Sequence, residues 1–358
     1  MERDGSQGST EIRGTAGPRS WLPLPKKAAA SIKGVPSGLR GENLPSELVR
    51  ALKRTLQNIG ADAAADLAQI FSPLRKQWAA QGKAASLAEE LEQAKESLCS
   101  ITSGNPTFSA TVPIVLERAG AQRPELIASG VLVRIVNRTF LLTTAHVADL
   151  QNEGTLLIPG QRGFIPPNGY VSSMRLPASG RRTDDKLDVA YFWLDQDCVN
   201  DLHADCTVLE RQDVSLEAEP LLHTIYTFAG YPWRRGRVSE GSVATDFTTF
   251  SGIEAKPSEY KALGLLRSRH IAIRFHRRRT FSVRLGRVIT SPLPHGMSGG
   301  GVYAWSQEAL QTWPVRLPLV GIVSEGVPER SLLIATRLHV YIGCIFYNQP
   351  DLAAIVGA

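Results

Sequence analysis

The chain has 358 residues, of which 43% are hydrophobic and 21% charged, and its formal net charge is +6. This length suits one large domain with an appended segment, or two domains, and the composition can fill a sizeable core. No apolar run approaches the roughly 18–20 residues that a membrane-spanning helix needs, and residues 1–6 lack the charged-then-apolar pattern of a secretory signal. The sequence therefore predicts a cytoplasmic protein with no membrane attachment.

The cysteines give no sign of a metal site. Cys99, Cys198, Cys206 and Cys344 form no Cys-x-x-Cys pair and show no zinc-like spacing. Cys198 and Cys206 could meet across a loop, but free thiols are the ordinary state in a reducing compartment. We therefore expect free cysteines, no structural metal and no organic cofactor.

The first hundred residues differ from the rest in composition and in the spacing of their apolar residues. Residues 1–43 are rich in Gly, Pro, Ser and Lys without apolar periodicity, which predicts a disordered leader. In residues 44–104 apolar residues recur every three or four positions, and Pro and Gly divide the segment into two or three predicted helices. This helical segment carries no catalytic signal and is a candidate surface for a partner protein.

From residue 105 onward the chain consists of short runs typical of β-strands, separated by Gly, Pro and Asn. The predicted strands are residues 110–116, 127–136, 140–144, 189–194, 225–229, 271–275, 281–289, 302–303 and 319–323. Many short strands with turn residues between them predict an all-β sandwich or barrel. Residues 336–347 are expected to form a final helix.

The most distinctive stretch surrounds a serine with glycines: Pro294-His295-Gly296-Met297-Ser298-Gly299-Gly300-Gly301. Glycines let the backbone turn sharply and let a substrate carbonyl approach main-chain N–H groups. Alone, such a motif could equally be a simple turn. Two upstream residues favour a catalytic role for the serine motif. His146 follows the apolar run 140–144 after one residue, and Asp188 directly precedes the apolar run 189–194. Taken singly, each of these residues is more often structural; together they give the order His, Asp, Ser.

With these residues in place, the chain resembles the chymotrypsin-like (trypsin-fold) serine peptidases. Five segments match in the family's order, namely residues 144–146, 188–190, 296–300, 320–326 and 334–338. The resemblance covers about residues 105–348. It implies a mainly β fold with two antiparallel six-stranded β-barrels, at about residues 105–215 and 216–335, then a C-terminal helix at about 336–347 and a tail at 349–358. Val147 stands where secreted animal members often have a cysteine, which indicates a bacterial-type intracellular member.

The resemblance also implies an activity and assigns roles to residues. It implies a trypsin-like serine protease, a hydrolase that cleaves a protein or peptide substrate through an acyl-enzyme. The implied catalytic triad is His146, Asp188 and Ser298, and the backbone N–H groups of Gly296 and Ser298 are the implied oxyanion hole. The residues implied for substrate binding are Ser291, Val323, Ser324, Glu325 and Gly326, the last four as a strand edge that pairs with the substrate backbone.

Two departures from the family pattern bear on regulation and specificity. Met297 stands where zymogen-activated members carry an aspartate that pairs with a newly cut N-terminus, so other contacts must hold the oxyanion loop. No acidic residue lies in residues 291–293, and Gly326 is opposite, which favours a small or apolar residue at the cleaved position. Glu325 stands where a tryptophan is common, which weakens that inference.

The same residues admit three other interpretations. The stretch 296–300 also satisfies the Gly-x-Ser-x-Gly elbow of α/β-hydrolases, but no aspartate lies between Ser298 and His339, the one downstream histidine, and the βαβ rhythm is missing. A trypsin-fold binding or regulatory module with little or no proteolytic activity remains an alternative. A third reading is an interaction protein recruited through residues 44–104.

The charge is unevenly distributed along the chain. Residues 184–219 contain eleven Asp/Glu against two Lys/Arg, and residues 230–290 contain thirteen Lys/Arg against four Asp/Glu. The basic run from Arg267 to Arg287 could contact nucleic acid. Its aromatic residues are few and no RNA- or DNA-binding motif is present, which favours a solvated edge hairpin protected from aggregation by charge.

Overall fold

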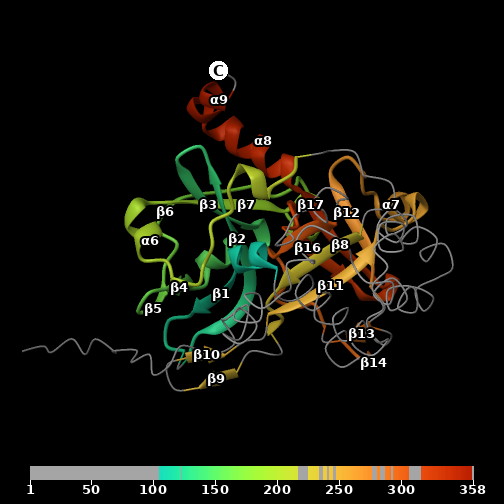
Figure 1. The fold of residues 1–358 in the computed structure, drawn as a ribbon, viewed down its shortest axis with the longest axis horizontal. Helices are drawn as coiled ribbons and strands as arrows, with labels where there is room; N and C mark the ends of the chain where they lie inside the picture. Colours follow the sequence, from blue (N-terminus) through green and yellow to red (C-terminus); the bar gives the residue numbers. More distant parts are fainter. Residues whose placement is uncertain are drawn as a thin grey trace, which may run out of the picture.

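The structure of the protein, a computed structural model, describes residues 105–356 (Figure 1). Gaps in this range are residue 122, residues 217–224, 234–236, 240–241, 245–246, 276–279, 283–286, residue 292 and residues 306–315. The predicted leader 1–43 and the predicted helical segment 44–104 lie outside the described residues. No helix in the described part is long and apolar enough to cross a bilayer.

The N-terminal half of the described chain forms a seven-stranded antiparallel sheet in the order β5-β4-β1-β2-β3-β7-β6. Its strands are β1 (Thr111–Glu117), β2 (Glu125–Ile135), β3 (Arg138–Thr144), β4 (Thr155–Gly160), β5 (Gly163–Ile165), β6 (Gly169–Ser173) and β7 (Val189–Leu194). The central strands are buried on both faces, because apolar residues fill them almost without interruption. This sheet is the green part of Figure 1.

The C-terminal half forms a six-stranded antiparallel sheet in the order β11-β8-β15-β16-β17-β12. Its strands are β8 (Ile225–Gly230), β11 (Thr248–Ile253), β12 (His270–Arg274), β15 (Gly301–Trp305), β16 (Leu319–Val327) and β17 (Leu332–Arg337). A bridge between Glu254 and Ile273 brings the two ends of this sheet together, so the sheet is curled. Two short hairpins accompany it, one of β9 (Arg237–Ser239) with β10 (Ser242–Ala244) and one of β13 (Thr280–Ser282) with β14 (Arg287–Ile289).

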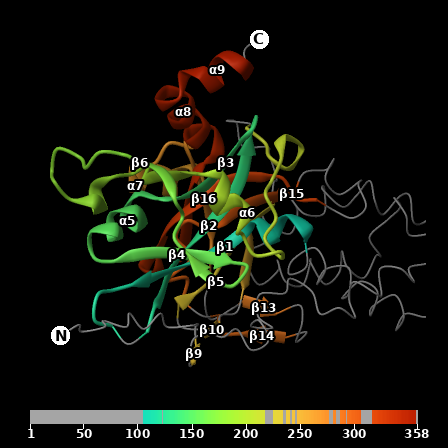
Figure 2. The ribbon, with the colours of Figure 1, turned by 90° about the vertical axis from the view of Figure 1, so that its left-hand side faces the viewer.

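The described helices are short except for one at the C-terminus. They are α5 (Ala145–Ala148), α6 (Gln196–Asn200), α7 (Pro257–Leu263), α8 (Leu338–Asn348) and α9 (Pro350–Val356). Leu338, Tyr341, Ile342 and Ile345 recur at helical spacing, and α8 buries them in a cluster that also contains residues of both sheets. Figure 2 shows α8 and α9 extending together from one end of the molecule.

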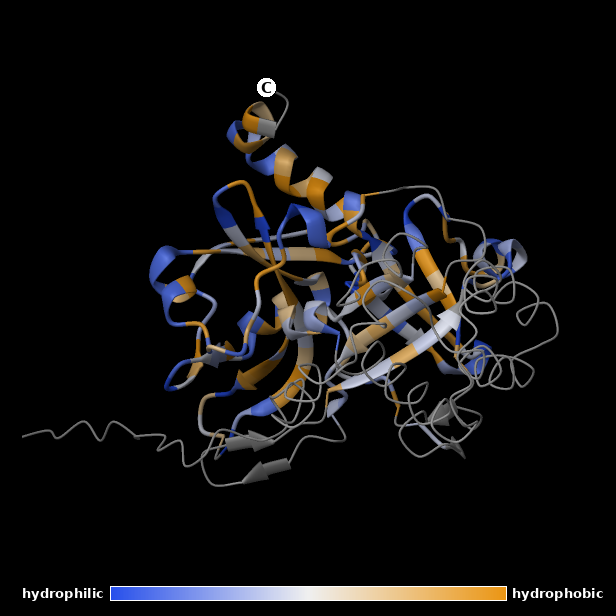
Figure 3. Ribbon diagram, in the orientation of Figure 1, coloured by the Kyte–Doolittle hydropathy of each residue, from blue (hydrophilic) through white to orange (hydrophobic). Residues whose placement is uncertain are grey.

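The mainly β fold predicted from the sequence is confirmed, with two antiparallel sheets in the expected order. The first sheet has seven strands, where the resemblance implied six. Four of them coincide with apolar runs found in the sequence, and residues 155–173 supply three that the sequence did not reveal. The single strand expected over residues 281–289 is wrong: β13 and β14 pair antiparallel, so the chain reverses direction within this run. Apolar residues concentrate along the strands and polar ones in the connections (Figure 3).

Candidate active site

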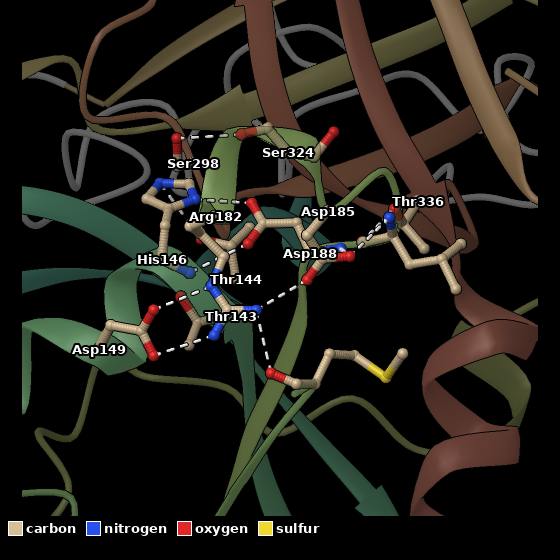
Figure 4. Close-up of polar contacts among 12 residues, drawn as sticks. Thr143, Thr144, His146, Asp149, Arg182, Asp185, Asp188, Ser298, Ser324 and Thr336 are labelled. Carbon is tan, nitrogen blue, oxygen red and sulfur yellow. Dashed lines mark hydrogen bonds and ion pairs between the residues drawn. The ribbon is translucent and has the colours of Figure 1, made fainter. Parts of the chain in front are cut away.

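His146 lies where β3 ends and α5 begins. The N–H of Ala145 donates to the main-chain oxygen of Asp188 at 3.1 Å, which ties the start of α5 to the loop before β7. The carboxylate of Asp188 then contacts His146 twice, with Oδ2 2.6 Å from Nδ1 and Oδ1 accepting from the backbone N–H at 3.0 Å (Figure 4). One carboxylate therefore fixes both the ring and the backbone of the histidine.

Asp188 itself has a backbone conformation that L-residues rarely adopt, with φ of 50°. Such a conformation persists only where the surroundings determine it. The side chain of Asp185 supplies part of this support, because its Oδ1 accepts from the N–H groups of Leu187 and Asp188 at 3.2 and 3.1 Å. From the C-terminal sheet, the Thr336 hydroxyl donates to the Leu187 carbonyl at 2.7 Å. The aspartate is thus held from both sheets.

An arginine behind Asp188 extends this support. Arg182 donates to Asp185 Oδ2 at 2.8 Å and to both carboxylate oxygens of Asp149 at 2.8 and 3.1 Å. Burial by itself would lower the pKa of Arg182, but the hydrogen bonds that its guanidinium donates to the two carboxylates raise the pKa above its ordinary value. Asp149 directly follows α5, so this ion-pair cluster joins the segment after His146 to the segment before Asp188 (Figure 4).

Ser298 lies in a tight turn that precedes β15. Within it, the Met297 N–H donates to the Pro294 carbonyl at 3.0 Å and the Gly300 N–H donates to the Met297 carbonyl at 2.8 Å. Gly299 has φ of 82°, and a Cβ at that position would lie 2.0 Å from the carbonyl oxygen of Ser129. Only glycine fits there, which explains part of the glycine-rich sequence around the serine.

The Ser298 hydroxyl is turned toward the C-terminal sheet. Its Oγ donates to the carbonyl oxygen of Ser324 at 3.2 Å, and His146 Nε2 lies 3.4 Å from the Thr144 hydroxyl. No hydrogen bond joins Ser298 to His146 in this conformation, although both residues are fully described. In Figure 4 the Ser298 hydroxyl is directed toward Ser324, and the Asp188 carboxylate faces the imidazole of His146. The three residues that the sequence singled out are therefore brought together at one place.

The turn directs two backbone N–H groups in a definite way. The carbonyl of His295 accepts from Trp233 N–H at 2.9 Å, and the carbonyl of Met297 accepts from Gly300 N–H at 2.8 Å. In a trans peptide the N–H points opposite to the C=O of the same peptide. The N–H groups of Gly296 and Ser298 therefore point away from those donors, and within the described chain neither donates to a protein atom.

The residues expected to bind substrate fall into two sets. Beyond Ile322, β16 is no longer paired with β15 and continues only against β17, so one edge of residues 324–327 is open. Glu325 and Gly326 on this edge are exposed. Val323, Ser324 and Ser291 are instead buried, so their side chains lie inside the protein.

Some supporting residues escaped the sequence analysis. Asp185 and Arg182 had a weak signal, because an aspartate three residues before Asp188 is typical of a side-chain-capped turn. Ser129, which contacts the serine turn from β2, had no signal at all. Its role depends on a contact between residues 167 positions apart in the chain.

Other features of the described residues are ordinary structural ones. Arg267 pairs with Glu254 at 3.0 Å and Arg274 with Glu259 at 3.3 Å, so part of the basic run is neutralised within its own sheet. Cys198, Cys206 and Cys344 are free thiols. Within the described ranges, no cluster of His, Cys, Asp and Glu has the size of a metal site.

His146 follows β3 and Asp188 precedes β7 in the first sheet, and the Ser298 turn precedes β15 of the second sheet. Two antiparallel sheets arranged in this way match the architecture that the resemblance implied. The fold is chymotrypsin-like.

Comparison with known proteins is limited to solved structures, since no family model and no curated protein matches the chain. The VesB protease of Vibrio cholerae is similar at 14% identity and a TM-score of 0.40, over 68% of this chain and 64% of that one. A Glu endopeptidase in complex with MPD matches at 12% identity and a TM-score of 0.37, over 68% of this chain and 91% of its own. Tobacco etch virus protease complexed with product matches at 11% identity and a TM-score of 0.36, over 68% and 80%. This chain thus spans less than two thirds of the VesB protease.

Proposed function

We propose that the chain is a serine endopeptidase that hydrolyses peptide bonds through an acyl-enzyme on Ser298. The proposed triad is His146, Asp188 and Ser298, with an oxyanion hole formed by the N–H groups of Gly296 and Ser298. The observation that carries the proposal is the double contact of one carboxylate with His146, 2.6 Å to Nδ1 and 3.0 Å to the backbone nitrogen. This contact orients the ring and favours the tautomer whose Nε2 can accept a proton.

The first step requires a small rotation of the nucleophile. Ser298 Oγ–H donates to the Ser324 carbonyl, and a change of χ1 would redirect it to His146 Nε2; side-chain rotations of this kind take picoseconds to nanoseconds when they are unhindered. As Oγ attacks the carbonyl carbon of the substrate, its proton passes to Nε2. The negative charge of Asp188 stabilises the imidazolium that results.

The negative charge that develops on the substrate oxygen needs donors that are already in place. The Gly296 and Ser298 N–H groups point away from the donors that hold their own peptide carbonyls, and they have no acceptor among the described residues. Such preorganised donors stabilise the transition state, and the loss of one typically costs about 2.7–4 kcal/mol. A hole of this kind would be ready before the substrate binds.

The remaining steps complete the hydrolysis. The imidazolium of His146 gives its proton to the leaving amine as the C–N bond breaks, which leaves the acyl group on Ser298. A water molecule then loses a proton to His146 and attacks the ester, and Ser298 recovers its proton as the acid product leaves. The open edge of β16 beside Glu325 and Gly326 would bind the substrate backbone as an added strand.

The proposal is tested by covalent labelling of the purified full chain with a fluorophosphonate probe. We expect labelling of the unmodified chain and none of Ser298→Ala or His146→Ala, because the probe needs both the nucleophile and the base. Ser179→Ala, which removes an exposed serine, is the matched control and should label normally. Cleavage of fluorescein-labelled casein by the same four proteins would connect the label to peptide-bond hydrolysis.

The second candidate function is a binding or regulatory module of the same fold. The Ser298 hydroxyl's contact with Ser324, in place of a contact with His146, is the observation that favours it. A folded sample that neither takes up the label nor cleaves casein would contradict the peptidase proposal and support this module.

A further inference from the structure

Ser129 on β2 joins the N-terminal sheet to the turn that carries Ser298. Its Oγ donates to the Gly296 carbonyl at 3.0 Å and accepts from the Tyr231 N–H at 2.9 Å. Its backbone N–H donates to the Ser298 carbonyl at 2.8 Å. Its carbonyl accepts from the Thr143 hydroxyl at 3.0 Å. Ser129 itself is completely buried, and its bonds to Tyr231 and Thr143 are buried as well.

The sheet leaves Ser129 free to make these contacts. β3 pairs with β2 only from Val131 onward, and the last two residues of β3, Thr143 and Thr144, pair with β7. On the other side, Pro113 of β1 lies opposite Ser129 and has no N–H to offer. The backbone groups of Ser129 are thus not used by the sheet: its N–H donates to the serine turn, and its carbonyl accepts from the Thr143 hydroxyl.

Ser129 holds the two carbonyls on either side of Met297. The Gly296 carbonyl is bound by the Ser129 hydroxyl and the Ser298 carbonyl by the Ser129 N–H. The Gly296 carbonyl belongs to the Gly296–Met297 peptide and the Ser298 carbonyl to the Ser298–Gly299 peptide. These two planar peptides flank the Met297–Ser298 peptide, so fixing both of them limits rotation of the peptide that contributes the Ser298 N–H. The first of them also adjoins the peptide that contributes the Gly296 N–H. Met297 is apolar and completely buried, so it contributes packing and no charge to this arrangement.

We propose that Ser129 is a positioning residue that keeps the N–H groups of Gly296 and Ser298 directed at the substrate oxygen. This inference rests on the proposed peptidase function and extends it: the hole is held by a hydroxyl of the N-terminal sheet, so no processing of the chain is needed to form it. Only the hydroxyl carries the specific role. The backbone bond from Ser129 to Ser298 would survive replacement of the side chain.

The test compares Ser129→Ala and Ser129→Cys with Thr107→Val in the full chain. Thr107 is a suitable control because its buried hydroxyl donates to the Leu317 carbonyl at 3.1 Å and contacts none of the proposed catalytic residues. Fluorophosphonate inactivation gives the maximal rate and the half-saturating probe concentration separately, and thermal unfolding of each variant reports its stability.

For Ser129→Ala we expect the maximal inactivation rate to fall about 10- to 100-fold, because lost donor alignment acts in the transition state. The half-saturating probe concentration should change less than about twofold. Ser129→Cys keeps the size and a weaker donor, so its rate should lie between those of alanine and serine. Thr107→Val should lower the unfolding midpoint and leave the rate within about twofold.

The alternatives are separable. Unchanged rates in both Ser129 variants would overturn the positioning role while leaving the peptidase intact. If the maximal inactivation rate falls equally in Ser129→Ala and Thr107→Val, in proportion to the stability that each variant loses, Ser129 has a merely structural role. A chain without any labelling would instead refute the proposed function. If Ser129→Ala does not fold, the cysteine variant still decides between the first two outcomes.

Discussion

The two sides of the candidate site are held by different kinds of contact. His146 and Asp188 are supported by charged side chains, with Asp185, Arg182 and Asp149 forming a cluster behind them. The Ser298 turn is supported almost entirely by backbone hydrogen bonds and by a single neutral hydroxyl. The side with the proposed acid–base pair therefore depends on electrostatics, whereas the side with the proposed nucleophile depends on close approach of main chain to main chain.

This difference has a physical basis. A carboxylate that must stay charged beside a histidine needs partners that fix its position without removing its charge, and a hydrogen-bonded ion-pair cluster does this. Backbone N–H donors need only a rigid loop, because their partial charges are permanent. Changes of side chains should therefore affect the two sides unequally, and four predictions make that comparison quantitative.

The largest effect is expected from Asp188→Asn. An amide can present an N–H donor to Nδ1 and thereby select the wrong tautomer of His146, so kcat for casein cleavage should fall about 10⁴-fold. Asp213→Asn is the matched control, since Asp213 is also buried and pairs with Arg316 at 2.8 Å. It should lower stability without a comparable loss of kcat. Similar losses of kcat in both variants would contradict the role given to Asp188.

On the nucleophile side, Gly299→Ala should destabilise the fold by about 4 kcal/mol or more. The new Cβ would lie 2.0 Å from the carbonyl oxygen of Ser129. Because this oxygen belongs to the backbone and the Cβ is attached directly to the turn, neither atom can move aside without a shift of main chain. Gly264→Ala has the same sign of φ but an open surrounding, so only the left-handed conformation is penalised, by about 1–2 kcal/mol. Urea unfolding of both variants measures the difference; equal values would show that the turn tolerates a shift.

A smaller effect is expected from Arg182→Met, which keeps much of the aliphatic stem and removes the guanidinium. Asp185 and Asp149 lose their shared partner, so the turn before Asp188 should loosen and kcat should fall about 10-fold with little change in KM. The control is Arg181→Met, which removes the more exposed ion pair of Arg181 with Asp184, at 2.9 Å. It should leave kcat unchanged. Steady-state kinetics on casein would distinguish the two.

The smallest expected effect is on the pH dependence of stability, at His339, which belongs to neither side of the candidate site. Burial, followed by the charges of Arg337 and Arg269, lowers the pKa of His339 below its ordinary value of 6.5. Between that lowered pKa and 6.5 the unfolded chain binds a proton that the folded chain does not, so stability rises with pH across this window and is lost as pH falls. His339→Gln should make the unfolding free energy less dependent on pH between about pH 5 and 7. An unchanged slope would assign the dependence to another group.

The sequence could predict the strands and the three central residues for understandable reasons. Strands such as β3 and β7 are continuous apolar runs, and such runs are recognisable without knowledge of their partners. His146, Asp188 and Ser298 each lie where an element begins or ends, and motif order made their combination specific. The strand β6 is only five residues long, is mostly exposed and contains no continuous apolar run, so its sequence did not predict a strand.

By itself, the sequence determined the β architecture, the order of the candidate catalytic residues and the positions where only glycine fits the turn. The tertiary structure alone decided what holds them: the Arg182 cluster behind Asp188, the Ser129 hydroxyl on the Gly296 carbonyl, and the turn of the Ser298 hydroxyl toward Ser324. Local patterns record local conformation and burial. Hydrogen bonds between separate segments, such as Ser129 with Gly296 and Ser298 with Ser324, leave no periodic trace in the chain, because they depend on how the folded segments meet.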